Sequence, residues 1–253
     1  MSIENDQLLT FLNTLLQPER VRDFCPNGLQ VEGKQHIERI VTGVTASQAL
    51  IDEAIRLQVD AIFVHHGYFW KGEDPCIKGM KKQRLASLLA HDINLYAYHL
   101  PLDVHPTLGN NAQLARLLDI QIEGGLETAN PGSVAMRGRF LTAQEPQQLA
   151  RIIEAKLGRK PLHESACSKV INTVAWCTGG GQNYIELAAQ QGIDAFITGE
   201  VSEQTIHTAR EMGIHFFAAG HHATERYGAK AVGDHIAETL GLEVQFVDID
   251  NPA

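Results

Sequence analysis

The stretch SQALIDEAIRLQVDAIFVHHG, residues 47–67, joins an amphipathic helix, a turn and a short apolar strand. Apolar residues recur at helical spacing and then give way to the run AIFV, which is typical of a buried strand. The runs IVTGV and NLYAY lie on either side of this unit, and helical patterns occur at 47–58, 81–91 and 110–118. Such alternation predicts β-α-β units on a largely parallel sheet with helices over its faces.

The second half of the chain repeats this outline. The stretch GQNYIELAAQQGIDAFITGEV, residues 181–201, aligns with the first at a constant offset that matches Asp60 with Asp194 and His66 with Glu200. In each copy the next strand is followed by His-x-x-x-carboxylate, as the stretches NLYAYHLPLD and FFAAGHHATE show. Two arbitrary β-α-β units would share helices and strands, but not this polar signature in corresponding places.

The repeat predicts an α/β protein of two similar domains, residues 1–126 and 127–253, related by a pseudo-two-fold axis. The C-terminal part could pack back on the first domain. The residues between the copies contain no long Ser/Gly linker, so we expect closely packed halves with a ligand site in the cleft between them.

Composition excludes several classes of protein. The formal net charge of −9 argues against an extended nucleic-acid surface, which needs a stripe of Lys and Arg. The four cysteines contain no C-x-x-C pair and indicate reduced thiols of a cytoplasmic protein. No basic and apolar signal segment opens the chain, and no apolar run is long enough to cross a membrane.

Polar side chains gather where the predicted strands end. In open α/β sheets, ligands collect at the carboxyl ends of the strands. The candidates there are His65, His66, His99, Asp103, Glu200, His221 and Glu225.

Imidazole nitrogens and carboxylate oxygens without cysteine suit zinc, iron, manganese or nickel in an open site. Five ligands are too many for one such site and match two divalent ions sharing a carboxylate. Adjacent side chains leaving a strand are expected to point in different directions, so the paired histidines could serve different ions. The five are His65, His66, Asp103, His221 and Glu225.

Several neighbouring residues have open roles. His99 could ligate a metal or orient Asp103, and His222 is expected to point away from the face that His221 and Glu225 share. His207, on the helix after Glu200, could face the site or serve packing. The glycine-rich turn CTGGGQ, residues 177–182, could bind an anion but lacks the pattern of a P-loop.

These motifs together resemble a known family. PNGLQVEG, VHHGYFW, HLPLD, ITGEVSEQTIH and GHHATE are similar over essentially the whole chain to the YbgI-type family of dinuclear metal proteins, also called GTP cyclohydrolase 1 type 2 homologues or Ngg-interacting-factor-like proteins. The resemblance implies a dinuclear site between two α/β domains and a toroidal homohexamer. The family's ligand pattern carries over onto His65, His66, Asp103, His221 and Glu225.

Two functions fit these residues. In the first, the protein is a metal-dependent hydrolase in which Glu200, His99 or His207 acts as general base or acid on a small-molecule or phosphorylated substrate. In the second, it is a non-enzymatic metal-binding protein or ring scaffold. A link to DNA damage and radiation resistance is implied only by the resemblance, and the acidic charge counts against a DNA-binding ring.

Overall fold

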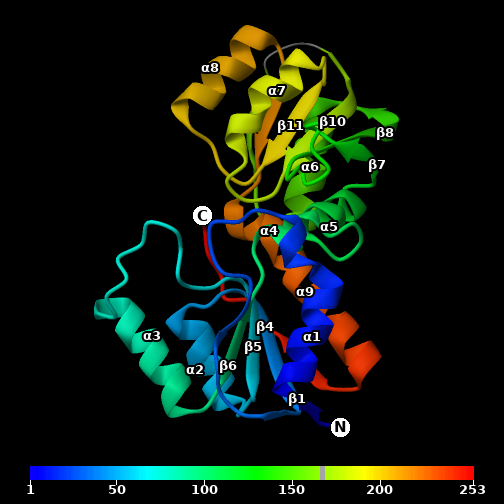
Figure 1. Ribbon diagram of the computed structural model, residues 1–253. Coiled ribbons are helices and arrows are strands. Elements are labelled where there is room, and N and C mark those ends of the chain that lie inside the picture. Colours follow the sequence, from blue (N-terminus) through cyan, green and yellow to red (C-terminus); the bar gives the residue numbers. More distant parts are fainter. Residues whose placement is uncertain (166–168) are drawn as a thin grey trace. The chain divides into compact units, whose positions relative to one another are not determined.

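The computed structural model describes residues 1–165 and 169–253 (Figure 1). The chain forms two compact units, which we call unit 1 and unit 2. Unit 1 contains Met1–Gly109 and Gly228–Ile249, and unit 2 contains Asn110–Tyr227 and Asp250–Ala253. Over the described ranges, no helix combines the length and the apolar character that a membrane span requires.

Unit 1 is built on a five-stranded sheet in the order β13-β4-β5-β6-β2. The first four strands are parallel and β2 is an antiparallel edge. The strands are β2 (Gly28–Val31), β4 (Arg39–Thr45), β5 (Ala61–His66), β6 (Asn94–Ala97) and β13 (Glu243–Phe246), with β1 (Ile3–Glu4) and β3 (His36–Ile37) paired separately. The helices are α1 (Asn5–Leu16), η1 (Pro18–Arg20), α2 (Gln48–Arg56), α3 (Gly79–Ala90), α4 (Leu100–Val104) and the later turns of α9 (His221–Leu240).

Strand alternation divides the core of unit 1 between the two faces of the sheet. Ile62 and Val64 of β5 pack with the buried leucines of α2 and α3, whereas Ala61 and Phe63 pack with α1 and α9. All four side chains are at most 1 % exposed, as a parallel strand covered on both faces requires. This double burial explains why AIFV shows no polar alternation in the sequence.

Unit 2 is built on a six-stranded sheet in the order β7-β8-β10-β11-β12-β9. Strands β10, β11 and β12 are parallel, and the others are antiparallel. The strands are β7 (Ile120–Gly125), β8 (Met136–Gln144), β9 (Leu162–Glu164), β10 (Ile171–Cys177), β11 (Ala195–Thr198) and β12 (His215–Ala218). The helices are α5 (Asn110–Leu117), α6 (Pro146–Leu157), η2 (Gln182–Tyr184), α7 (Ile185–Gln190), α8 (Glu203–Met212) and the first turns of α9.

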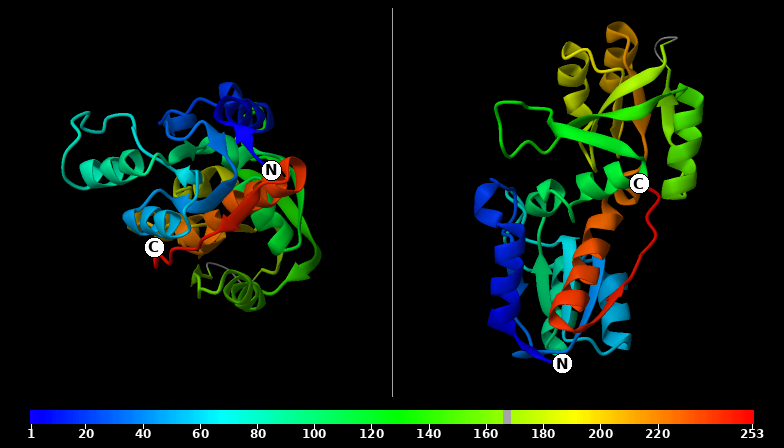
Figure 2. Two further views of the ribbon diagram at one scale, coloured as in Figure 1. Left: turned by 90° about the horizontal axis from the view of Figure 1, so that it is seen from below. Right: turned by 90° about the vertical axis from the view of Figure 1, so that its right-hand side faces the viewer.

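The faces of this sheet are covered in the same way. Val174 and Trp176 of β10 pack with α5 and α6, whereas Ala175 and Cys177 pack with α7 and α8. Figure 2 shows α6 on the opposite side of this sheet from α7. The mixed α/β architecture predicted from the sequence is therefore present in each unit.

The repeated aspartate has a structural role. Asp60 accepts hydrogen bonds from the backbone N–H groups of Glu38 and Arg39, where β4 begins. Asp194 accepts from the N–H groups of Asn172 and Thr173, where β10 begins. Each carboxylate thus fixes the start of the neighbouring strand, which explains its place in both copies.

The boundaries of the units differ from the predicted limits of 1–126 and 127–253. Helix α5 and strand β7 belong to unit 2, because β7 pairs with β8. The later turns of α9 belong to unit 1, where β13 adds to the sheet beside β4. Sequence periodicity places elements along the chain, but the pairing partners of an edge strand decide its unit.

Candidate metal centre

The two histidines that end β5 differ in burial. His65 is fully buried and its Nδ1 lies 3.1 Å from the carbonyl oxygen of Tyr98, so the imidazole donates from Nδ1 and turns Nε2 towards the site. Nδ1 of His66, which is half-buried, lies 3.1 Å from Thr45 Oγ1. A backbone carbonyl that accepts from one ring nitrogen, as that of Tyr98 does from His65, fixes the orientation of a metal-binding histidine.

The adjacent histidines do not point apart as the strand alternation predicted. The ring centroids of His65 and His66 are only 4.4 Å apart, and the rings are tilted by 44°. The two imidazoles therefore lie close together, as ligands of neighbouring metal ions would.

His99 and Asp103, which follow strand β6 in the chain, join this cluster. One ligand nitrogen from each of His65, His66 and His99 lies within 4.8 Å of the others. Asp103, in the short helix α4, is buried and places Oδ1 3.5 Å from His65 Nε2. We call His65, His66, His99 and Asp103 the unit 1 cluster.

Asp23, which no sequence motif indicated, orients His99. Asp23 Oδ1 lies 2.7 Å from His99 Nδ1, and its Oδ2 accepts the backbone N–H of Leu100 at 2.9 Å. Burial favours the neutral carboxyl, but hydrogen bonds from His99 and Asn27 outweigh it and lower the pKa of Asp23 to about 2. The rings of Trp70 and His99 pack edge to face, with their centroids 4.9 Å apart.

The first turns of α9 carry the ligands predicted in unit 2. The helix begins at His221, so His221 and Glu225 share one face, and His221 Nε2 lies 3.0 Å from Glu225 Oε2. His221 Nδ1 lies 2.7 Å from Glu200 Oε1. We call Glu200, His221 and Glu225 the unit 2 cluster.

The two carboxylates decide the charge of His221. Burial of the imidazole opposes protonation, but the hydrogen bonds and negative charges of Glu225 and Glu200 outweigh it and raise the pKa of His221 to about 9. Without a cation, the site takes up a proton near neutral pH. A divalent ion would supply the positive charge that these carboxylates favour.

Gly179 leaves room for the unit 2 cluster. Its φ is +66°, and a Cβ at this position would overlap Glu225 Oε1 and lie 3.0 Å from His221 Nε2. The backbone of the turn after β10 therefore forms one wall of the cluster that only glycine permits. This cradle and the oxygen and nitrogen donors fit a divalent metal ion.

The glycine-rich turn itself does not favour an anion. The N–H groups of Gly179 and Gly181 donate to the hydroxyls of Thr224 and Thr198, at 3.0 and 3.1 Å. The carboxylate of Glu200 lies beside Gly180. A turn whose amides are already bonded and whose neighbour is anionic is a poor phosphate cradle.

The remaining predicted residues lie as follows. His207 is an exposed residue of α8, with Nε2 4.0 Å from Glu203 Oε1, and its catalytic role stays a prediction. His222 is buried on a different face of α9 from His221 and Glu225. Cys25, Cys76 and Cys177 form no disulfide bond among the described residues, and Cys167 lies outside those residues.

The comparison with family models is decisive, because the model described as Duf34/NIF3 (NGG1p interacting factor 3) matches residues 3–252. The chain belongs to the Duf34/NIF3 family. Among Duf34/NIF3 relatives, the "GTP cyclohydrolase 1 type 2 homolog" of Vibrio cholerae is 59 % identical over 99 % of this chain and 100 % of its own length. The protein of the same name from Escherichia coli K12 is 57 % identical over the same shares.

Solved structures of the family have the same fold. The structure described as "protein ybgI, unknown function" has a TM-score of 0.95 and 56 % identity, covering 99 % of this chain and 100 % of that one. A protein from Thermus thermophilus has a TM-score of 0.89 and 33 % identity, over the same shares. The resemblance inferred from the sequence motifs is confirmed.

Proposed function

We propose that the protein binds two divalent metal ions in one dinuclear centre and uses it for hydrolysis. The observation that carries this proposal is that one ring nitrogen from each of three histidines lies within 4.8 Å of the others, beside the buried carboxylate of Asp103. The unit 1 cluster alone is rich in nitrogen donors and poor in carboxylates, and the unit 2 cluster has the opposite balance. We infer that both supply ligands to the same centre.

The ligand count supports two ions. His65, His66 and Asp103 from unit 1, with His221 and Glu225 from unit 2, give five donors, and a shared carboxylate leaves each ion an open position. When bound, two such ions lower the pKa of water to about 7 and stabilise a developing oxyanion. Zinc, iron, manganese and nickel all accept these donors.

His99 is our candidate for the general base or acid. Asp23 accepts from Nδ1 and thereby leaves Nε2 as the nitrogen that can take a proton from a nucleophile and return it to a leaving group. The ring of Trp70 packs edge to face with the same imidazole. Neither feature is required of a site that only stores metal.

Glu200 is proposed to orient His221. Its 2.7 Å contact with Nδ1 has the geometry of a carboxylate that fixes a metal-binding imidazole through the nitrogen not bound to metal. Glu200 was a catalytic candidate from sequence; in this proposal it acts through His221.

Elemental analysis tests the metal centre. We expect about two metal ions per chain in protein purified without chelator, and a large loss in the H65A/H66A double variant. The control is His36→Ala, because this histidine is 68 % exposed and contacts only Glu4 among the ion pairs of the described residues. Metal-free protein that cannot be reloaded, or a double variant with its full metal content, would refute the proposal.

A substrate screen separates hydrolysis from storage. Phosphoesters, cyclic amides and purine nucleotides, including GTP because of the relatives' name, are incubated with metal-loaded protein. For any substrate turned over, His99→Gln is expected to keep most of the metal and lose activity at least a hundredfold. Equal activity in the variant would remove His99 from the chemistry.

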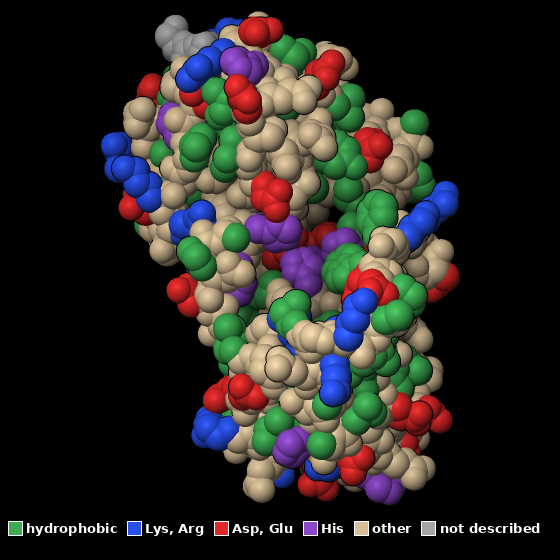
Figure 3. Space-filling model, turned by 90° about the vertical axis from the view of Figure 1, so that its left-hand side faces the viewer, with side chains coloured by type: hydrophobic (Ala, Val, Ile, Leu, Met, Phe, Trp, Pro, Cys, Tyr) green, Lys and Arg blue, Asp and Glu red, His purple; other side chains and the backbone are tan. Residues whose placement is uncertain are grey.

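The oligomer and its partners remain proposals. The family resemblance led us to expect a homohexamer, which light scattering of the purified chain would test. We do not expect nucleic acid as a partner, since the chain is acidic. On the face in Figure 3, Lys and Arg side chains are scattered and form no single basic patch.

A further inference from the structure

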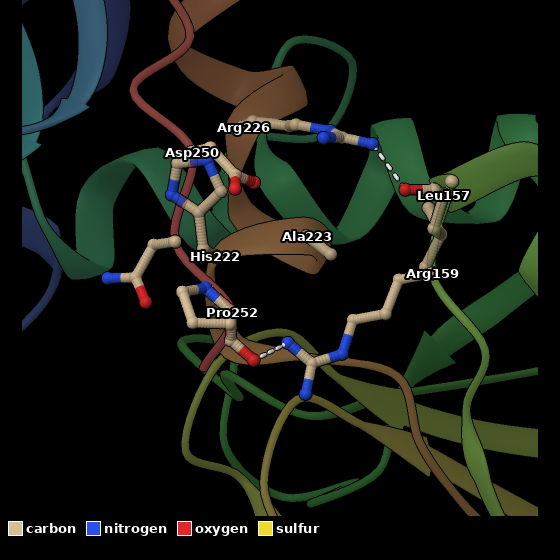
Figure 4. A pocket seen from close by; sticks show the side chains of 9 residues that line it. Leu157, Arg159, His222, Ala223, Arg226, Asp250 and Pro252 are labelled. Carbon is tan, nitrogen blue, oxygen red and sulfur yellow. Dashed lines mark hydrogen bonds between the residues drawn. The ribbon is translucent and has the colours of Figure 1, made fainter.

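A small cationic cavity lies in unit 2, apart from the residues assigned to metal. Its volume is about 220 Å³, and it is lined by the end of α6, the first turns of α9 and the C-terminal tail (Figure 4). Two guanidinium groups, Arg159 and Arg226, and one carboxylate, Asp250, belong to the lining, which is therefore net positive. His222 adds a buried imidazole.

Arg159 lines this cavity and has no acidic side-chain partner among residues 1–165 and 169–253. It is half-buried and donates to the carbonyl oxygen of Pro252. A half-buried guanidinium with five donors usually finds a carboxylate or phosphate, because these anions match its planar fork. A single backbone carbonyl is a weak substitute for such a partner.

The start of α9 adds donors beside Arg159. Gly220 has a φ of +99°, and a Cβ there would lie 2.8 Å from Arg159 Cδ, so glycine lets this side chain lie against the helix start. The N–H of His222 points to the tail and donates to Ala253 O at 3.3 Å. The first N–H groups of a helix carry partial positive charge and favour anions.

Arg226 is held in place by its own contacts. Its Nη2 donates to the carbonyl oxygen of Leu157 and lies 3.2 Å from the hydroxyl of Tyr227. Because His222 and Arg226 are four residues apart, they share a face of α9, one position round from the face of His221 and Glu225. The cavity and the metal ligands therefore use different faces of one helix.

We propose that this cavity binds an anionic group, a phosphate or a carboxylate, through Arg159 and the first N–H groups of α9. The carbonyl oxygen of Pro252 and an oxygen of the last residue, Ala253, occupy these donors and compete with the anion. A volume of about 220 Å³ suits one such group rather than a whole nucleotide, since drug-sized ligands need roughly 300 Å³ or more. This site does not depend on the proposed hydrolase activity.

Calorimetric titration of the full chain tests the site, with sodium phosphate and with citrate at constant ionic strength. Arg159→Gln is expected to weaken binding at least tenfold. The matched control is Arg151→Gln, because Arg151 is an exposed residue of the same α6 region and does not line the cavity.

The H65A/H66A variant separates this site from the metal centre, because bound metal ions also attract phosphate. Binding that persists in H65A/H66A and is lost in R159Q supports the proposal, and the stronger anion identifies its chemical source. Equal affinities of R159Q and R151Q, loss of binding in H65A/H66A, or no binding of either anion would overturn it. If R159Q does not fold, R159K should fold and bind severalfold more weakly, and unchanged affinity in R159K would overturn the proposal.

Discussion

The carboxylate of Asp23 lies 2.7 Å from His99 Nδ1 and is almost completely buried, with 3 % of its side chain exposed. The same carboxylate accepts the N–H of Leu100, at the start of α4. One side chain therefore fixes both the imidazole beside the unit 1 cluster and the helix that carries Asp103. This dual contact makes Asp23 a test of how the cluster is built.

Replacing Asp23 with Asn should lower the free energy of unfolding by about 2 kcal/mol, because an amide NH₂ cannot accept the hydrogen bonds now made to one carboxylate oxygen. Urea unfolding measures the change. The control is Asp52→Asn, since Asp52 is exposed on α2 and accepts from Gln48, and its effect should stay within about 0.5 kcal/mol. Equal losses in the two variants would refute a structural role for Asp23.

Asp23 should also shape acid stability. Its pKa is lowered from 3.8 to about 2, so its charged form contributes stability above pH 4 that is lost as the pH falls through 2. The pKa difference corresponds to about 2 kcal/mol. In urea titrations between pH 5 and 2, the wild-type protein should lose more stability than D23N, and parallel curves would contradict this.

The His221–Glu225 pair could be predicted from the sequence, whereas the Asp23–His99 pair could not. A histidine and an acid four residues apart at a helix start meet by helix geometry alone. Asp23 and His99 are 76 positions apart, and Asp23 lies in a connection outside the repeated segment. No periodicity or offset identifies such a contact, because it depends on how the connection after η1 packs against β6.

The unit boundaries illustrate the same limit. The internal repeat predicted the parallel strands of both sheets, since each β-α-β unit carries its own hydrophobic pattern. The sequence allowed the C-terminal part to pack back on the first domain, but the repeat did not place β13 beside β4, because the partner of an edge strand depends on packing that the local sequence does not encode.

Metal affinity should rise with pH, because His221 must lose its proton before Nε2 can bind metal. Its pKa is raised from 6.5 to about 9, so affinity should increase about tenfold per pH unit between pH 7 and 9 and then level off. Chelator competition with zinc measures the slope. In Glu200→Gln one stabilising carboxylate is lost, the pKa of His221 falls, and the curve should level off at lower pH.

The same group has the opposite effect on the metal-free protein. Since the pKa of His221 is higher in the folded state, its protonated form contributes stability that is complete below pH 6.5 and lost as the pH rises through 9. Chelator-treated protein should therefore lose stability across this range while metal-loaded protein does not. Parallel pH profiles of the two forms would show that His221 is not a ligand.

The sharpest test of the unit 2 cluster is Gly179→Ala compared with Gly192→Ala. Both glycines have positive φ, +66° and +72°, so alanine meets similar backbone strain of about 1 kcal/mol at each. Only at Gly179 would the added methyl overlap Glu225 and approach His221, because nothing lies within 4 Å of a Cβ at Gly192. G179A should lose more stability than G192A, because the buried side chain of Glu225 must shift, and it should also bind zinc at least tenfold more weakly. Equal zinc affinity in the two variants would show that the carboxylate of Glu225 does not hold metal.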